Sequence, residues 1–387
     1  MGKYDFDEVI ERRGSGCIKW DEAPSADVIP LWVADMDFRA APAIVDAIKR
    51  RADHGVFGYT MVGDDYYEAV ISWFGRRHQW TIGREEIIYT TGVVPAVSAV
   101  IKALAMPGEQ VLMLSPDYNC FFSSIRNNGC VVLETPLIVK DGMFSVDWDD
   151  FEAKCAMVKT TLFLLCNPHN PTGRVWTKEE LQRMNDICLR HNVKVISDEI
   201  HCELIMPGNT FQPFATVGEA CRHNGVVLNS PSKSFNIAGL QVANIVCSQP
   251  EWRRRIDRAI NINEVCDVNP FGPVALIAAY NECEDWIDEL NGYLWENYRA
   301  LCRFCADHLP MVKVMPMEGT YLPWIDIRGL GMTSQQLADR LLTEAKVWVN
   351  PGTIYGEQTG EGFIRLNIAC PRSVLMEGLR RIQAIIK

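Results

Sequence analysis

The chain lacks the features that mark membrane-spanning, nucleic-acid-binding and fibrous proteins. No uninterrupted apolar run approaches the ~20 residues that a membrane helix needs. No run of basic residues exceeds the three from Arg253 to Arg255, and the formal net charge is -11. Nucleic acid and anionic membranes attract positive charge, so neither is an expected partner. The sequence has no internal repeat and no low-complexity linker, and 48% of its residues are hydrophobic, as in a packed globular protein.

Targeting and metal-binding patterns are also missing. The N-terminal "MGKYDFDEVIERR" mixes both charge signs and has no apolar core, so no export signal is expected and the predicted location is the cytoplasm. The 14 cysteines lie scattered in apolar segments such as "LFLLC" and "ANIVC", which is typical of reduced core thiols. Cys302 and Cys305 form one C-x-x-C pair with helical spacing, but no second Cys/His pair has ligand spacing, and no metal site is predicted.

The length of 387 residues is enough for two domains. Through the middle of the chain, apolar strand patterns alternate with helical patterns such as "VVPAVSAVIKALA" and "KEELQRMNDICLRHN", the latter with Thr177 as a plausible N-cap. The predicted strands are "EEIIYTTG", "EQVLMLSPDY", "TLFLLCNPHNPTG", "VKVISDE", "GVVLNSPSK" and "QVANIVC". This alternation predicts parallel strands joined by crossover helices, hence an α/β fold with helices on both faces of the sheet.

The C-terminal part has a different pattern. Helical spacing runs from about Glu282 to His308, and further helices are expected from Ser334 to Ala345 and at the C-terminus. Short strand patterns, "VKVMPMEGTYLPWIDIR", "VWVN" and "GFIRLNIA", lie between them. The predicted organisation is a large domain over residues 48–285 and a smaller α+β domain formed by residues 1–47 and 286–387.

Polar residues follow the predicted strands, at the sheet edge where ligands of α/β proteins bind. These residues are Gly92, Tyr118, Asn170, Asp198 and the segment from Ser230 to Lys233. A lysine amine reacts with an aldehyde only when neutral, and an ordinary lysine pKa of ~10.4 leaves little neutral amine at pH 7. An aldehyde cofactor that the protein holds by its phosphate group would stabilise the imine that this reaction forms. Because the hydroxyls of Ser230 and Ser232 and the N–H groups of the "TTGVV" turn at Gly92, Val93 and Val94 suit a phosphate, the expected cofactor is pyridoxal phosphate.

The other loops suit the ring of that cofactor. Asp198 can keep the pyridine nitrogen protonated, which makes the ring an electron sink. Asn170 can donate to the ring hydroxyl with His201 beside it, Tyr118 can lie against the ring face, and Arg365 offers a planar fork for a substrate carboxylate. Each residue also has an interpretation that needs no cofactor. Lys233 would then be a surface lysine, Asp198 a helix cap and Asn170 part of a turn. Tyr118 would be a packing residue, and Arg365 would form a surface ion pair.

The motifs "NPHNPTG", "SDEIH", "SPSKSFNIAGLQ" and "FIRLNIACPRS" resemble, in this order, the aspartate-aminotransferase superfamily of fold-type I pyridoxal-phosphate enzymes. The segments "PLWVADMDF", "GVFGYT", "PDYNCFF" and "VNPGTIYGE" are similar to the MalY/PatB-like branch of cystathionine β-lyases. The resemblance spans nearly the whole chain. It implies a large domain with a mostly parallel seven-stranded sheet flanked by helices.

The resemblance also implies roles for single residues. Lys233 would carry the covalent link to the cofactor, Asn170 and Asp198 would hold the ring, and Arg365 would bind the substrate carboxylate. Tyr59 would reach the phosphate of a neighbouring subunit, which implies a homodimer with shared active sites. Ala34, in the segment Trp32–Phe38, would border the substrate pocket. His201 stands where many aminotransferases have a tyrosine, as it does in the lyase branch.

The resulting hypothesis is a carbon–sulfur β-lyase that cleaves cystathionine or related cysteine S-conjugates, with L-cysteine as a further candidate, to a thiol, pyruvate and ammonia. Lys233 would remove the Cα proton, and Tyr118 would assist proton traffic near the leaving sulfur. Two alternatives stay open: an aminotransferase, which shares the lysine, aspartate and arginine, and a regulatory protein that binds a transcription factor.

Overall fold

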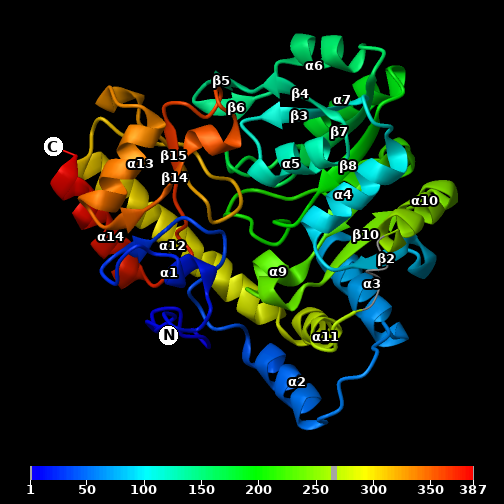
Figure 1. Ribbon diagram of the computed structural model, residues 1–387, viewed down its shortest axis with the longest axis horizontal. Helices are drawn as coiled ribbons and strands as arrows, with labels where there is room; N and C mark the ends of the chain where they lie inside the picture. The colour runs from blue at the N-terminus through cyan, green and yellow to red at the C-terminus, as the bar shows by residue number, and fades with distance from the viewer. Residues whose placement is uncertain (1, 263–267, 387) are drawn as a thin grey trace.

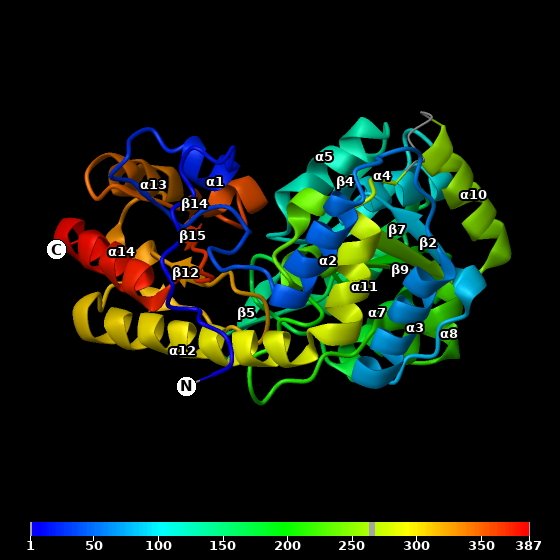
Figure 2. The same cartoon turned by 90° about the horizontal axis from the view of Figure 1, so that it is seen from below.

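The computed structural model describes residues 2–262 and 268–386. The chain folds into two lobes that the long helix α12 (Glu284–His308) connects (Figure 2). The larger lobe contains a seven-stranded sheet and the smaller lobe a four-stranded one. The predicted α/β architecture with a second α+β unit is confirmed.

The large sheet has the strand order β2-β10-β9-β8-β7-β3-β4 (Figure 1). Its strands, in chain order, are β2 (Ile87–Thr90), β3 (Gln110–Ser115), β4 (Val131–Pro136), β7 (Thr160–Cys166), β8 (Lys194–Asp198), β9 (Gly225–Asn229) and β10 (Ala243–Cys247). All neighbours from β9 to β4 pair in parallel. Strand β10 is antiparallel to both of its neighbours, so the alternation correctly predicted this strand but not its direction. The connection from β9 holds only the short helices α9 (Pro231–Ser234) and η3 (Ala238–Leu240), too little for a crossover helix.

Helices cover both faces of this sheet, as predicted. Side chains alternate between the faces along each strand, and in β3 Val111 and Met113 pack on one face while Leu112 and Leu114 pack on the other. One face carries α4 (Val93–Leu104), α5 (Asn119–Asn127) and α10 (Pro250–Asn261). The opposite face carries α6 (Trp148–Cys155), α7 (Lys178–Arg190) and α8 (Glu219–Asn224).

Helix α7 begins where the sequence predicts. The Thr177 hydroxyl accepts a hydrogen bond from the Glu180 N–H at 3.2 Å, and the Glu180 carboxylate accepts one from the Thr177 N–H at 2.9 Å. This reciprocal pair satisfies two backbone donors that have no partner within the helix. The predicted N-cap is confirmed.

The smaller lobe combines both ends of the chain. Its sheet has the order β11-β12-β15-β14, with β11 (Lys313–Val314), β12 (Trp324–Asp326), β14 (Asn350–Pro351) and β15 (Phe363–Arg365). The helices α13 (Ser334–Thr343) and α14 (Arg372–Ile385) pack beside α12 and this sheet. From the N-terminal segment, β1 (Ile29–Pro30) pairs in parallel with β13 (Val347–Trp348). The N-terminal segment is therefore part of this lobe.

The division into two domains remains a proposal. The boundary expected at 285 falls at the start of α12, and the one expected at 48 falls inside α2 (Pro42–Asp53). Helix α2 packs against α11 (Gly272–Glu282) of the larger lobe. We therefore propose that the first boundary lies just before α2 rather than within it.

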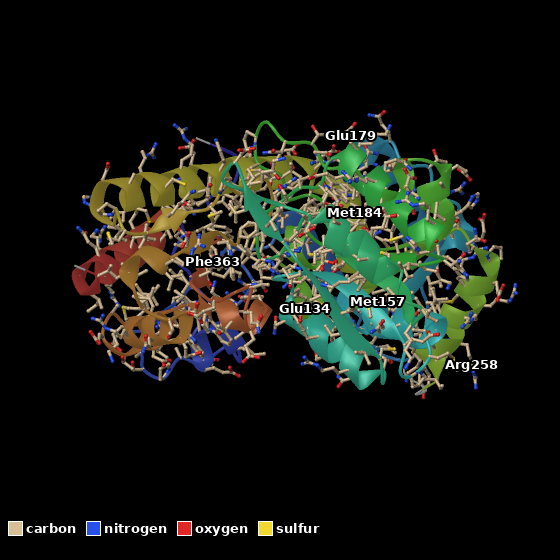
Figure 3. The ribbon with its side chains drawn as sticks, turned by 90° about the horizontal axis from the view of Figure 1, so that it is seen from above. Glu134, Met157, Glu179, Met184, Arg258 and Phe363 are labelled. Atoms are coloured by element: carbon tan, nitrogen blue, oxygen red, sulfur yellow. The ribbon has the colours of Figure 1, made fainter. Side chains whose placement is uncertain are left out.

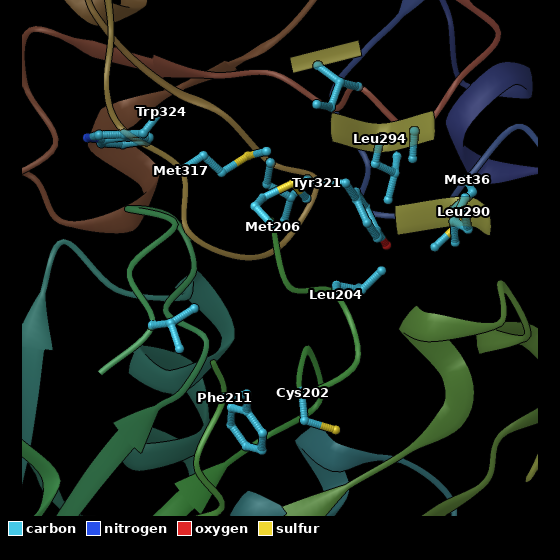
Figure 4. Packing of buried hydrophobic residues seen from close by; sticks show 14 of the residues in the cluster. Met36, Cys202, Leu204, Met206, Phe211, Leu290, Leu294, Met317, Tyr321 and Trp324 are labelled. Atoms are coloured by element: carbon cyan, nitrogen blue, oxygen red, sulfur yellow. The ribbon is translucent and has the colours of Figure 1, made fainter. Parts of the chain in front are cut away.

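One large apolar cluster extends from the sheet into the smaller lobe. Figure 4 shows Met317, Tyr321 and Trp324 of the smaller lobe near the loop that carries Leu204 and Met206. The Leu204 carbonyl accepts a hydrogen bond of 2.8 Å from the Thr320 N–H. Phe363 lies on the smaller-lobe side of the junction, opposite the lobe that carries Glu134 (Figure 3), and its ring centroid is 6.0 Å from that of Phe144 in the larger lobe. The lobes share a core, which fixes the loops between them.

The described residues show the state of the cysteines and the character of the helices. Every cysteine in residues 2–262 and 268–386 is a free thiol, and most are buried. In the same residues, no helix has both the length and the apolar character needed to cross a membrane.

Candidate active site

The predicted site residues lie on loops that follow the sheet strands, as expected. Tyr118 follows β3, Asn170 follows β7, Asp198 ends β8 and Lys233 lies in α9 just after β9. Because β3, β7, β8 and β9 run in parallel, these four loops meet at one edge of the sheet. Arg365 reaches the same place from β15 of the smaller lobe, where its guanidinium donates to the Asn170 amide oxygen at 3.0 Å.

The amine of Lys233 points into the protein. Its Nζ donates a hydrogen bond of 2.7 Å to the carbonyl of Ala34, in the N-terminal segment. Burial lowers the pKa of Lys233; Arg365 acts in the same direction, whereas Asp35 and Asp198 oppose it. A lowered pKa increases the fraction of neutral, nucleophilic amine. Lys233 is therefore not an ordinary surface lysine, and Ala34, which was expected to border the substrate pocket, lies beside it.

Asp198 is a buried carboxylate with few partners. Its Oδ1 accepts a hydrogen bond of 3.0 Å from the Ile200 N–H, and the residues after it form turns rather than a helix. This arrangement excludes the helix-cap interpretation. Burial, with a smaller contribution from the nearby Asp117, raises the pKa of Asp198 to about 7, although the Ile200 N–H and Lys233 both act to lower it. A cationic group placed against this carboxylate would favour its ionised form.

Arg365 and Asn170 form a buried polar pair between the lobes. Arg365 is 3% exposed, and its second terminal nitrogen donates to the Trp32 carbonyl at 2.9 Å. The guanidinium carbon lies 4.7 Å from the centroid of the Tyr355 ring. The Nε atom is buried without a hydrogen-bond partner among the described residues. Arg365 is not a surface ion pair, and its free donor suits a carboxylate ligand.

The two ring side chains near this pair are neutral at physiological pH. Burial lowers the pKa of His201 to about 3, with Lys233 and Arg365 adding to the effect. Its Nδ1 has no partner among the described residues, so a polar group of a ligand can meet it there. Burial raises the pKa of the Tyr118 hydroxyl, and the neighbouring Cys120 adds to this rise.

The expected anion site is only partly as predicted. Gly92 is the N-cap of the 12-residue helix α4, and the N–H groups of Val93 and Val94 lie in its first turn, where no earlier helical carbonyl can accept them. The Ser230 hydroxyl donates to the Val242 carbonyl at 2.6 Å and accepts from the Ser232 N–H at 3.0 Å. Because its one proton is already used, Ser230 caps α9 rather than offering a free donor. Ser232 is half-buried, and its hydroxyl makes no hydrogen bond to another of the described residues.

Tyr59 does not join the site of its own chain. Its side chain is 97% exposed, on the loop between α2 and α3 (Asp64–His78). The same loop exposes Val56, Phe57 and Met61. The loop is thus available to a neighbouring molecule.

Tyr321 also lies near the site, although no sequence signal assigned it there. The Tyr321 hydroxyl donates to the Ala34 carbonyl at 3.0 Å, the same carbonyl that receives Lys233. The Tyr321 ring also lies edge-on to His201, with centroids 6.0 Å apart. Tyr321 occurs in "EGTYLPW", which indicates only a strand. Its position in the site depends on the packing of the two lobes.

The residues present fit one kind of ligand. A lysine amine with a lowered pKa lies within electrostatic reach of a buried carboxylate and of an arginine with a free donor, and the N-terminus of α4 lies at the same edge of the sheet, because β2 runs in the direction of β9. These groups suit a planar aldehyde with a basic ring nitrogen and an anionic group, together with a substrate carboxylate.

Comparison with known proteins agrees with this geometry. Residues 26–382 match the family model described as aminotransferase class I and II. The chain is 40% identical to cystathionine β-lyase PatB of Bacillus subtilis, over 99% of this chain and 100% of PatB. It is 35% identical to the protein MalY of Escherichia coli, over 97% of each chain. The crystal structure of cystalysin from Treponema denticola, which contains pyridoxal 5'-phosphate, superposes with a TM-score of 0.96 at 36% identity, covering 99% of this chain and 98% of cystalysin.

The chain belongs to the aminotransferase class I and II family, and the resemblance to its MalY/PatB-like branch is confirmed.

Proposed function

We propose that this protein is a pyridoxal-phosphate-dependent carbon–sulfur β-lyase that cleaves cystathionine or a related cysteine S-conjugate. The observation that carries the proposal is the half-buried Lys233, whose amine points into one site with Asp198 and Arg365. The relatives named cystathionine β-lyase and cystalysin support the lyase over the aminotransferase. Lys233, Asp198 and Arg365 alone do not distinguish the two reactions, because both need a carbanion at the substrate Cα.

Each residue has a defined task in this proposal. Pyridoxal phosphate, when bound, supplies an electron sink for the charge that develops at the substrate Cα. Asp198 holds the ring nitrogen, Asn170 the ring hydroxyl, and Gly92, Val93, Val94 and Ser232 the phosphate. Arg365 binds the substrate carboxylate through its free Nε–H and its terminal N–H groups.

Lys233 is the residue that moves the proton. Its Nζ, once free, accepts the proton from the substrate Cα, and the Ala34 carbonyl is a hydrogen-bond acceptor that keeps the amine in position. Tyr118 stays protonated because burial raises its pKa, so its hydroxyl is able to donate towards the leaving sulfur.

The products distinguish the lyase reaction from the aminotransferase reaction. The purified enzyme is incubated with cystathionine and no keto acid, and pyruvate and free thiol are measured with time. A lyase releases both over many turnovers. An aminotransferase stops after one turnover and leaves the cofactor in its amine form, which would refute the proposal.

We also propose that the protein is a cytoplasmic homodimer with shared active sites. The exposed Tyr59 and its apolar neighbours Val56, Phe57 and Met61 support a contact with a second copy, in which Tyr59 meets the partner's bound phosphate. Sedimentation velocity tests the dimer. Tyr59→Phe removes one hydroxyl and is expected to weaken pyridoxal phosphate binding several-fold without changing the sedimentation coefficient; unchanged affinity would exclude this role of Tyr59.

A further inference from the structure

Two buried ionisable residues beside the site have no task in the proposed reaction. Asp117 immediately precedes Tyr118 after β3, and His169 immediately precedes Asn170 after β7. Their side chains are 1% and 0% exposed, and His169 Nε2 lies 3.7 Å from Asp117 Oδ1. The approach of Asp117 to His169 therefore links the loop that carries Tyr118 to the loop that carries Asn170, one residue before each expected ligand contact.

The hydrogen-bond partners of this pair are incomplete. Asp117 Oδ1 accepts the Tyr118 N–H at 2.7 Å, and His169 Nδ1 lies 2.7 Å from the Thr172 hydroxyl. Asp117 Oδ2 and His169 Nε2 have no hydrogen-bond partner in residues 2–262 and 268–386. Unpaired buried polar atoms destabilise the folded state, so a proton on His169 that points towards the Asp117 carboxylate is favoured.

Proton counting identifies the arrangement in which the two side chains attract rather than repel each other. If the Thr172 hydroxyl donates to Nδ1, the ring proton is on Nε2 and points towards the Asp117 carboxylate. In the other neutral tautomer, a lone pair on Nε2 would face the same carboxylate oxygen, which is repulsive in a site without water. Burial raises the pKa of Asp117, but His169 and the Tyr118 N–H both oppose this rise and favour the carboxylate.

Asp117 also connects the pair to the rest of the site. Its N–H donates to the Tyr355 carbonyl at 2.7 Å, and Tyr355 is the residue over which the Arg365 guanidinium lies. Asp198 lies beside the His169 loop, since its carbonyl accepts the Asn167 N–H at 2.9 Å, and Asp117 is among the groups that raise its pKa. Other ionisable groups of the described residues within reach of Asp117 or Asp198 include Glu134, Cys166, Tyr118, Lys233 and Glu199.

We propose that Asp117 and His169 share one proton held on His169 Nε2, and that this pair positions Tyr118 and Asn170 and places a second negative charge near Asp198. Both are positioning residues, since neither has a place among the reacting atoms. The positioning of cofactor contacts rests on the proposed function. The proton and the charge do not, and both can be measured on the cofactor-free protein.

The proton is tested by NMR of the cofactor-free protein with 15N-labelled histidine. His169 is assigned by the signal that His169→Gln removes. The expected result is a neutral ring with hydrogen on Nε2 at pH 7. A ring with hydrogen on Nδ1 alone overturns the proposal, and this measurement needs only the wild-type fold.

The charge is tested through the titration of Asp198. Urea midpoints are measured against pH for the wild type, Asp117→Asn, His169→Gln and Glu134→Gln, each paired with the same protein carrying Asp198→Asn. Within each pair, the difference in urea midpoint between the two proteins, plotted against pH, reports the ionisation of Asp198.

The three backgrounds have different expected outcomes. Asp117→Asn removes a negative charge and shifts the Asp198 profile to lower pH. His169→Gln keeps a donor to an ionised Asp117, so its profile stays at the wild-type pH, and Glu134→Gln is the matched acid-to-amide control with no shift. A merely structural role for the pair would give the same profile in the Asp117 and His169 variants, and an unshifted Asp117→Asn profile overturns the proposal.

Discussion

Replacing Asp198 with asparagine should stabilise the cofactor-free protein while impairing its function. Burial raises the pKa of Asp198 from an ordinary value of 3.8 to about 7. Between these pH values the folded protein holds a proton that the unfolded chain releases, so this residue lowers stability as pH rises from ~4 to ~7. The gap between the two pKa values corresponds to about 4 kcal/mol at pH 8, of which ~3 kcal/mol develops between pH 5 and pH 8.

Asparagine keeps an acceptor for the Ile200 N–H and does not titrate. The free energy of unfolding of cofactor-free Asp198→Asn should therefore exceed that of the wild type by an amount that grows with pH up to ~7 and is constant above it. Urea unfolding at several pH values measures this difference. Glu199, whose pKa burial raises to about 8 with a smaller contribution from Asp198, is present in both proteins, so only the part of its shift that is due to Asp198 enters the difference.

Asp307→Asn, on the exposed surface of α12, is a matched control and should show no such growth. The same Asp198→Asn protein should bind pyridoxal phosphate more weakly than the wild type, because the ring nitrogen loses its anionic partner. A stability difference that is flat with pH, or a wild type that is the more stable protein at pH 8, would refute the reasoning.

Three further predictions follow from single contacts. Lys233→Ala should lower pyruvate release from cystathionine by a factor of ~10³ or more and abolish the borohydride-fixed cofactor adduct seen by mass spectrometry; retained adduct at another residue would exclude Lys233. Arg365→Lys keeps the charge but not the planar fork over Tyr355, so kcat/KM should fall by about tenfold or more, mainly through KM, and an unchanged KM would contradict carboxylate binding. Thr177→Ala removes the cap of α7 and should cost about 1 kcal/mol in urea unfolding with unaltered activity, and the equivalent change Thr333→Ala in α13 tests whether a second capping box behaves alike.

The elements that the sequence predicted well are those with local signals. Thr177 and Glu180 are three residues apart and cap α7 regardless of the rest of the chain. Lys233 and Asp198 follow apolar runs that could only be buried strands, so their place at the sheet edge follows from chain geometry. The direction of β10 was not predictable from its own pattern, because it depends on the length of the connection from β9.

The contacts that complete the site join residues far apart in the sequence. Arg365 and Asn170 are separated by 195 positions, and Lys233 and Ala34 by 199. No period or cap encodes such a pairing, so the sequence suggested Arg365 as a carboxylate-binding side chain but did not place it beside Asn170. Tyr321 and the Asp117–His169 pair were missed for the same reason, since their tasks arise only after the lobes and loops have met.

The unsatisfied groups of the fold gather where the ligand is expected. Arg365 Nε and His201 Nδ1 lack partners among the described residues, and Asp198 keeps a raised pKa in the same site. A protein optimised only for stability would remove such groups, because each costs free energy in the folded state. A ligand with a cationic ring nitrogen and a carboxylate would satisfy Asp198 and Arg365 together and recover part of that cost. Saturating pyridoxal phosphate should therefore raise stability most above pH 7, where Asp198 is ionised, and least at pH 5, where the buried carboxyl group is already neutral.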